Sequence, residues 1–140
     1  MTSRQAAIYG VSGPELSSDE IDFISEVKPL GFIIFSRNII SLEQVSNLVS
    51  HLKSFVKDDE TLVLIDQEGG RVARLRPPLI RGYPKAEIYG KIFELNPVNG
   101  MRAAYLGAVL MAKDLLSLGI NVDCTPVSYT HLTLPTSVIV

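Results

Sequence analysis

Short apolar runs alternate along the chain with longer stretches in which apolar residues recur at helical spacing. The run GFIIF, residues 31–35, is rich in β-branched and aromatic residues without polar alternation, which is typical of a strand buried on both faces. Segment 42–57 instead keeps an apolar stripe with the period of an amphipathic helix. Over the whole chain, the pattern predicts strands at 6–13, 31–35, 61–65 and 120–127, and helices at 16–27, 42–57, 85–93 and 97–119.

Local signals mark the ends of two helices and the connections between elements. Ser17 is followed three residues later by Glu20, which is the signature of a capping box at the start of the first helix. Gly119 is predicted to end the last helix at its C′ position. The polar strings SRN at 36–38 and KDDE at 57–60 are predicted to be a loop and a solvated turn.

The alternation of strands and helices is a βα repeat, and it predicts a parallel sheet. Polar residues follow the strands at 36–38, 66–68 and 123–125, and the sites of α/β proteins lie at the carboxyl ends of strands. A closed (β/α)8 barrel takes roughly 250 residues, so a chain of this length holds about half of one. We therefore expect half of a TIM barrel, and a doubly wound open sheet is the competing architecture.

Composition limits the partners and the location. The 140 residues carry a formal net charge of −2, so there is no basic excess to drive binding to nucleic acid or to an anionic membrane. The single cysteine, Cys124, excludes an internal disulfide. The longest apolar run, GFIIF, is far shorter than the ~20 residues of a transmembrane helix, and the N-terminus lacks a signal-type apolar run. We expect a cytoplasmic protein, with the Gram-negative periplasm as the alternative.

The most informative stretch is LVLIDQEGGRVAR, residues 62–74, in which acids, glycines and arginines follow a predicted buried strand. Asp66 lies where that strand ends, so its carboxylate is expected to face the mouth of the sheet. The two glycines allow a tight turn or a close approach of the backbone to a ligand. A carboxylate and an arginine in one cleft suit a polyhydroxylated ligand, and the pattern of a phosphate loop is missing. The alternative is a salt-bridged loop in which Asp66 pairs with Arg71 or Arg74.

The order of motifs along the chain resembles the N-terminal half of a glycoside hydrolase of family 3. The matching strings, in family order, are SGPELSSDE, GFIIFSRN, LIDQEGGRVARLR, LGAVLMAKDLLSLGINVD and CTPV. Among family members, the resemblance is strongest to the β-N-acetylhexosaminidases that remove N-acetylglucosamine from peptidoglycan fragments during cell-wall recycling. It covers residues 7–127, and it implies a TIM barrel.

The resemblance implies a role for the positions of the motif. Asp66 and Arg74 match residues that bind the N-acetylglucosamine unit beside the scissile bond. Asp66 would hold sugar hydroxyls, and Arg74 would assist from the same loop. The remaining motif residues are expected to support the loop: Glu68, Gly69, Gly70 and Arg71.

Other candidate residues are predicted to be structural. Arg37 and Asn38 match a family position at the barrel mouth, and we expect them to support it. His51 lies in an amphipathic helix, where a histidine is most often a surface or boundary residue. Asp123 is expected to hydrogen-bond the next loop, and Cys124 to be a small buried residue. No His, Cys or Asp cluster has metal-ligand spacing.

The resemblance also implies what this chain lacks. Family members are retaining enzymes in which a late aspartate attacks the anomeric carbon and a histidine on a long loop is the acid/base, instead of the usual two carboxylates. Both residues come after the point, at Val127, where this chain departs from the family pattern. The full enzyme would cleave N-acetylglucosamine from muropeptides as a monomer, without metal or organic cofactor, and the 140-residue chain alone is predicted to be inactive. The alternatives are a family 3 β-glucosidase and a small non-catalytic sugar-binding module.

The last stretch, VSYTHLTLPTSVIV, does not continue the family pattern. Codons for its first part can spell the transposase end and adapter of tagmentation sequencing libraries, read through in frame. We therefore expect residues 1–127 to be a partial family 3 domain and residues 128–140 to be a non-native tail. A natural divergent C-terminus is the alternative. Tyr129 and His131 are accordingly excluded from any active site.

Overall fold

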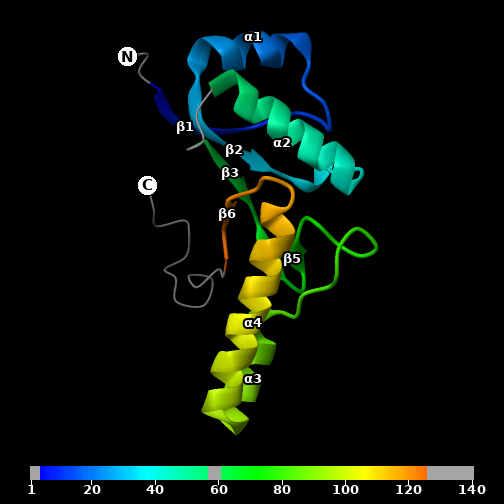
Figure 1. Cartoon of the computed structure of the whole chain (residues 1–140), viewed down its shortest axis with the longest axis vertical. Helices are drawn as coiled ribbons and strands as arrows, with labels where there is room; N and C mark the ends of the chain where they lie inside the picture. Colours follow the sequence, from blue (N-terminus) through cyan, green and yellow to red (C-terminus); the bar gives the residue numbers. More distant parts are fainter. Residues whose placement is uncertain (1–3, 57–60, 126–140) are drawn as a thin grey trace, which may run out of the picture.

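A computed structural model of the chain describes residues 4–56 and 61–125, and it shows a parallel sheet covered by helices (Figure 1). The predicted turn at 57–60 and the predicted non-native tail at 128–140 lie outside the described residues. The end of the predicted strand 120–127 does so as well.

Four parallel strands form the main sheet of the described part, in the order β1-β2-β3-β6. Their bounds are Gln5–Gly10 (β1), Pro29–Ile34 (β2), Leu62–Ile65 (β3) and Val122–Asp123 (β6). Ile34 lies opposite Ile65, and Ile65 lies opposite Asp123, so β2, β3 and β6 end side by side. The parallel sheet predicted from the βα repeat is confirmed, and the polar residues after these strands meet at one edge of it.

Strand β6 is shorter than the predicted strand 120–127. Among the described residues it pairs only with β3, which itself has four residues. Hydrogen bonds from Asn121 N to Val63 O (3.1 Å) and from Cys124 N to Ile65 O (2.9 Å) flank the short ladder. β6 runs beside the last two residues of β3, Leu64 and Ile65. Its ladder is therefore two residues long.

The described part contains the four predicted α-helices, which are α1 (Ser18–Val27), α2 (Leu42–Val56), α3 (Ala86–Leu95) and α4 (Pro97–Leu116). The predicted capping box is present. Ser17 Oγ accepts a hydrogen bond from Glu20 N (3.3 Å), and Glu20 Oε2 accepts one from Ser17 N (2.9 Å). After α4, Gly119 adopts a φ of +81°, the left-handed conformation of a glycine that closes a helix.

Two short elements differ from the prediction. Residues 36–38, predicted as a loop, form a 3-10 helix (η1, Ser36–Asn38), because Asn38 N donates to Phe35 O (2.9 Å) and Ile39 N to Ser36 O (3.2 Å). The acidic motif forms an antiparallel hairpin of β4 (Gln67–Gly69) and β5 (Val72–Ala73) that the sequence did not predict. Strands this short are not long enough to show a period of two.

The core lies between the sheet and the helices on one face. Its main members are Phe32, Ile34, Val63 and Ile65 from the sheet, Val45, Leu48, Val49 and Leu52 from α2, and Met111 and Leu115 from α4. The residues that alternate with them on the strands, Ile33, Leu62 and Leu64, are only half-buried. Helices over one face are typical of a barrel wall, whereas a doubly wound sheet carries helices on both faces.

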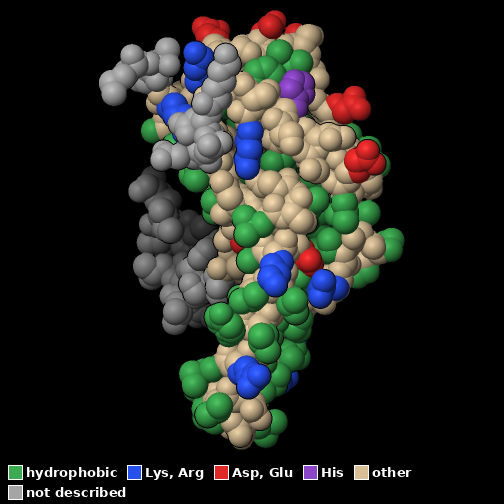
Figure 2. Space-filling view, viewed as in Figure 1, with side chains coloured by type: hydrophobic (Ala, Val, Ile, Leu, Met, Phe, Trp, Pro, Cys, Tyr) green, Lys and Arg blue, Asp and Glu red, His purple; other side chains and the backbone are tan. Residues whose placement is uncertain are grey.

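Helices α3 and α4 form a hairpin whose outer part projects from the sheet (Figure 1). The helices approach closely at Gly100, where an added Cβ would lie 2.4 Å from Phe93 Cα. Figure 2 shows apolar side chains gathered over this projecting part. The exposed apolar residues of the two helices include Leu95 of α3 and Tyr105 of α4, which are 88% and 69% exposed.

Candidate functional site at the carboxyl ends of the strands

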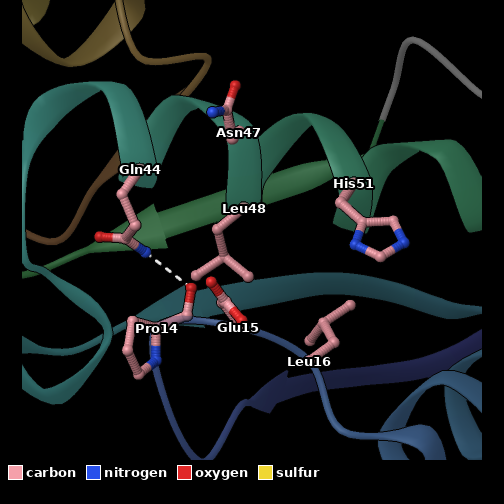
Figure 3. Close-up of a pocket in the computed structure, with 7 residues that line it drawn as sticks. All are labelled: Pro14, Glu15, Leu16, Gln44, Asn47, Leu48 and His51. Atoms are coloured by element: carbon pink, nitrogen blue, oxygen red, sulfur yellow. Dashed lines mark hydrogen bonds between the residues drawn. The ribbon is translucent and has the colours of Figure 1, made fainter.

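A hollow of about 340 Å³ lies between the segment after β1 and helix α2 (Figure 3). It is lined by Pro14, Glu15, Leu16, Gln44, Asn47, Leu48 and His51. Gln44 Nε2 donates to Pro14 O (2.7 Å) across it. His51 is exposed and packs on the Phe55 ring, with 5.0 Å between ring centroids. His51 is therefore a surface residue, as predicted. The hollow lies where the segment after β1 packs against α2.

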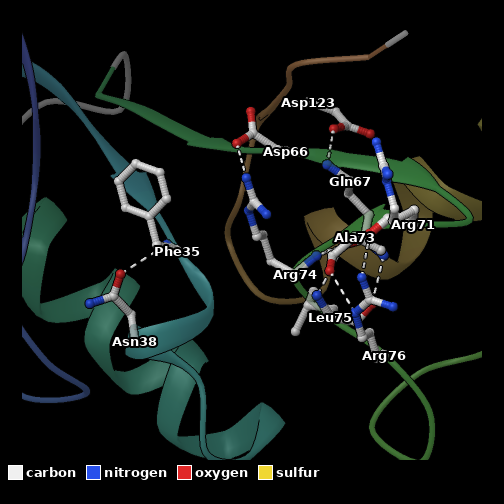
Figure 4. Close-up of polar contacts among 10 residues, drawn as sticks. All are labelled: Phe35, Asn38, Asp66, Gln67, Arg71, Ala73, Arg74, Leu75, Arg76 and Asp123. Carbon is white, nitrogen blue, oxygen red and sulfur yellow. Dashed lines mark hydrogen bonds and ion pairs between the residues drawn. The ribbon is translucent and has the colours of Figure 1, made fainter. Parts of the chain in front are cut away.

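A cluster of ionisable groups lies instead where β3 and β6 end (Figure 4). Asp66 follows β3 and Cys124 follows β6, and the strand register sets the two residues side by side. Asp123 interacts electrostatically with Asp66 and with Glu68 of β4. The predicted position of a site, at the carboxyl edge of the sheet, is thus where these side chains gather.

Asp66 and Arg74 form an ion pair across this edge. Arg74 Nη2 donates to Asp66 Oδ2 at 2.6 Å, and the two side chains are 28% and 26% exposed. The structure therefore brings together both residues predicted to bind a sugar. It also shows the pairing that the salt-bridged alternative required, with Arg74 as the partner of Asp66.

The side chain of Gln67 holds the loop after β4 from the inside. It is 1% exposed, and it makes three hydrogen bonds to the main chain of Arg74 and Leu75. Arg76 adds bonds to Ala73 O (2.9 Å) and to Arg71 O. The sequence had pointed to Glu68 and Arg71 as supports of the loop. Arg71 contributes its carbonyl oxygen and has an exposed side chain, and the part played by Gln67 was missed.

The carboxyl of Asp123 ties β6 to the start of β4. Its Oδ1 accepts a hydrogen bond from Gln67 N at 3.0 Å, so Asp123 makes a structural hydrogen bond as predicted, but the partner is the start of β4 and not the next loop. The pKa of Asp123 is raised to about 6, mainly by burial and also by the charges of Asp66 and Glu68, which together outweigh the lowering effect of this hydrogen bond. Burial also raises the pKa of the Cys124 thiol, with Asp66 and Asp123 adding to the rise. Cys124 is therefore in a setting that disfavours the thiolate.

The turn of the hairpin can be made only by glycine. Gly69 and Gly70 have φ values of +91° and +60°. A Cβ on Gly69 would lie 2.3 Å from Pro84 O, and one on Gly70 would lie 2.7 Å from Lys85 Cβ. The predicted need for glycine is therefore explained by a tight turn that presses against the segment leading into α3.

Tyr83 links this turn to helix α4. Its carbonyl oxygen accepts from Gly70 N (2.8 Å), and its hydroxyl donates to Asp114 Oδ2 (2.6 Å). Arg81 Nε lies 3.2 Å from the same carboxylate oxygen. Burial, together with the bond to Asp114, raises the pKa of Tyr83, so the hydroxyl stays a donor. The hairpin that carries the motif is thus braced from outside as well as from inside.

Arg37 and Asn38 support the neighbouring strand end. Asn38 is buried, donates from Nδ2 to Val11 O (3.0 Å) and Gly13 O (2.8 Å), and accepts from Phe35 N (2.9 Å). Arg37 Nε donates to Val11 O (2.9 Å), and its guanidinium lies 4.5 Å from the centre of the Phe35 ring. These contacts agree with the structural role predicted for both residues.

Neither a metal cluster nor a membrane-spanning helix is found within residues 4–56 and 61–125. No group of three or more His, Cys, Asp or Glu side chains there could hold a metal ion. No helix of this part is long and apolar enough to cross a membrane.

Two relatives of similar sequence carry the same name, β-hexosaminidase. No family model matches the chain. It is 37% identical over 120 residues to a β-hexosaminidase of Methylococcus capsulatus, an alignment that covers 86% of this chain and 34% of that protein. It is 31% identical over 123 residues to a β-hexosaminidase of Stenotrophomonas maltophilia, with 86% and 35% covered. The chain thus spans about a third of the length of these relatives.

Solved structures of similar fold agree with the sequence comparison. Native NagZ from Neisseria gonorrhoeae superposes with a TM-score of 0.81 at 25% identity, covering 88% of this chain and 36% of that chain. A family 3 β-N-acetylglucosaminidase from Paenibacillus sp. superposes with a TM-score of 0.73 at 31% identity, with 85% and 22% covered. The predicted resemblance to family 3 β-N-acetylhexosaminidases is confirmed, and so is the prediction that the chain covers part of a TIM barrel.

Proposed function

We propose that this chain supplies the N-acetylglucosamine-binding loop of a family 3 β-N-acetylhexosaminidase, which hydrolyses terminal β-linked N-acetylglucosamine. The observation that carries the proposal is the Asp66–Arg74 pair at the end of β3. It lies in a fold similar to that of NagZ, and one of the similar structures is NagZ in complex with N-trifluoroacetyl-D-glucosamine.

The chemistry of the pair suits a sugar. An ionised Asp66 accepts hydrogen bonds from two neighbouring hydroxyls, while Arg74 donates from a planar fork. Each side chain keeps about a quarter of its surface exposed, 26% for Asp66 and 28% for Arg74, so both can bind a ligand without unfolding the loop. In the free protein, the two groups already lie together as an ion pair at one edge of the sheet.

The remainder of the enzyme would supply the reacting groups. We infer a retaining mechanism in which an aspartate nucleophile and a histidine acid/base lie in the part of the relatives that this chain does not span. The substrate would be a muropeptide with terminal N-acetylglucosamine, and the full-length protein would be a cytoplasmic monomer without metal or organic cofactor. The 140-residue chain would bind the sugar but not cleave it.

Cloning the complete gene provides the test. Amplifying the locus from source DNA and reading past the Pro126 codon first tests the proposal that residues 128–140 are non-native. A native stop codon after Val140 would contradict that proposal. A continuation of the barrel pattern, with a histidine loop and a later aspartate, is the expected result.

The purified product of that gene is then offered chromogenic β-N-acetylglucosaminide and β-glucoside. Faster turnover of the N-acetylglucosaminide is expected, because the proposed site is one for the acetamido sugar. Preference for the β-glucoside would favour the family 3 β-glucosidase alternative. Sugar binding without turnover of either substrate would favour the non-catalytic module.

A further inference from the structure

We propose that Gln67 is a positioning residue of the sugar site, an inference that rests on the proposed function. Gln67 lies next to Asp66 in sequence and contacts the main chain of Arg74 in space. One residue therefore connects the two groups proposed to bind the sugar, although these are eight positions apart along the chain.

The hydrogen bonds of Gln67 fix the main chain on both sides of the Asp66–Arg74 ion pair (Figure 4). Its Oε1 accepts from Arg74 N (2.9 Å) and from Leu75 N (3.0 Å), and its Nε2 donates to Leu75 O (2.8 Å). Its own main-chain N–H donates to Asp123 Oδ1 at 3.0 Å, which fixes the residue directly after Asp66. The main chain at Asp66 and the main chain at Arg74 are thus held relative to each other.

Because Gln67 is buried, its bonds are expected to fix the main-chain position of Arg74 and Leu75. Gln67 is 1% exposed, so water cannot replace its amide as a partner of the Arg74 and Leu75 main chain. The ion pair cannot replace it either, since a pair of partly exposed side chains holds its geometry only weakly. The bonds of Arg76 go to Ala73 and Arg71 and so stay within the loop itself.

The test compares Gln67→Met with a matched variant, Gln44→Met, in the protein expressed from the complete gene. Gln44 also makes three side-chain bonds to main chain, with Ile40 N, Pro14 O and Asn38 O, but it belongs to α2 and faces the segment after β1. Both variants replace an amide by an apolar side chain of similar length. They differ in whether the lost bonds hold Arg74.

Gln67→Met is expected to lower kcat/KM for the chromogenic N-acetylglucosaminide by roughly 10- to 100-fold, because Arg74 loses its fixed position. KM is expected to rise more than kcat falls, and the Arg74 and Leu75 amides are expected to lose protection from hydrogen exchange. Gln44→Met should keep wild-type kcat/KM and protection at these two amides, even if Tm falls as far as in Gln67→Met.

Equal losses of kcat/KM in the two variants would overturn the proposal, since they would reflect general destabilisation. Unchanged exchange at Arg74 and Leu75 in Gln67→Met would overturn it as well. If the wild-type protein cleaves no N-acetylglucosaminide, the proposed function fails. The exchange comparison then still decides whether Gln67 holds Arg74.

Discussion

At the scale of single residues, Asp123 makes the edge of the sheet sensitive to pH. Burial, together with the charges of Asp66 and Glu68, raises its pKa from an ordinary 3.8 to about 6. Folding therefore favours the protonated carboxyl. The resulting gain in the free energy of unfolding is complete below the ordinary pKa and is lost as pH rises through about 6.

Asp123→Asn should remove this dependence, because the amide stays neutral and can still accept from Gln67 N. Because Asp123 is only half-buried, solvent screening reduces the effect, and from about pH 4 to about pH 7 the free energy of unfolding of the variant should gain roughly 1 kcal/mol relative to wild type. Urea unfolding at a series of pH values measures the difference. Asp22→Asn, at an exposed position of α1, is the control and should show no such trend. A pH-independent difference for Asp123→Asn would contradict the account.

The residues of the site differ in how far the sequence could reveal them. Asp66 and Arg74 could be singled out because a charged motif directly follows a strand that the apolar pattern predicts. Gln67 could not, because its importance comes from burial and from bonds to residues 74 and 75, and neither leaves a mark in the sequence. A polar residue inside a polar motif is expected to be exposed.

At the scale of elements, the longer helices and strands could be predicted because each has its own period or cap. The hairpin of β4 and β5 and the length of β6 could not, because both depend on a pairing partner rather than on local pattern. The hairpin is the element that presents the motif. Besides the bonds of Gln67, its stability therefore depends on the turn at Gly69 and Gly70 and on the segment packed against that turn.

Gly69→Ala tests the turn. The added methyl would strain a φ of +91° and overlap Pro84 O, so a loss of roughly 1–3 kcal/mol or more in the free energy of unfolding is expected. Gly90→Ala is the matched control, because Gly90 lies inside α3 with nothing within 4 Å of an added Cβ. That change should stabilise the protein by roughly 0.5–1 kcal/mol. Chemical denaturation compares the two, and equal effects would show that the turn does not require glycine.

At the scale of the whole molecule, the described part presents surfaces that an isolated domain would bury. β1 and β6 each have one partner strand there, and α3 and α4 expose large apolar side chains. Free strand edges and apolar patches of this kind favour association between chains. In the relatives, about two thirds of the length lies outside the part that this chain matches.

The 140-residue chain by itself is therefore expected to unfold with low cooperativity, to bind an apolar dye such as ANS, and to aggregate on heating. It should not hydrolyse a chromogenic N-acetylglucosaminide, because the nucleophile and the acid/base are proposed to lie elsewhere. Thermal unfolding followed by circular dichroism, together with the activity assay, checks both points. A sharp reversible transition or measurable turnover by residues 1–140 would contradict this view of the chain.

The most direct test of the central claim is kcat/KM of Asp66→Asn for the chromogenic N-acetylglucosaminide in the protein expressed from the complete gene. Loss of the charged acceptor, and with it of the Arg74 ion pair, should lower kcat/KM by about 100-fold or more, since charge-assisted bonds to the sugar are removed. Asp22→Asn, which makes the same chemical change on the exposed face of α1, should leave kcat/KM at the wild-type value. An Asp66→Asn variant as active as wild type would show that this carboxylate does not bind the substrate.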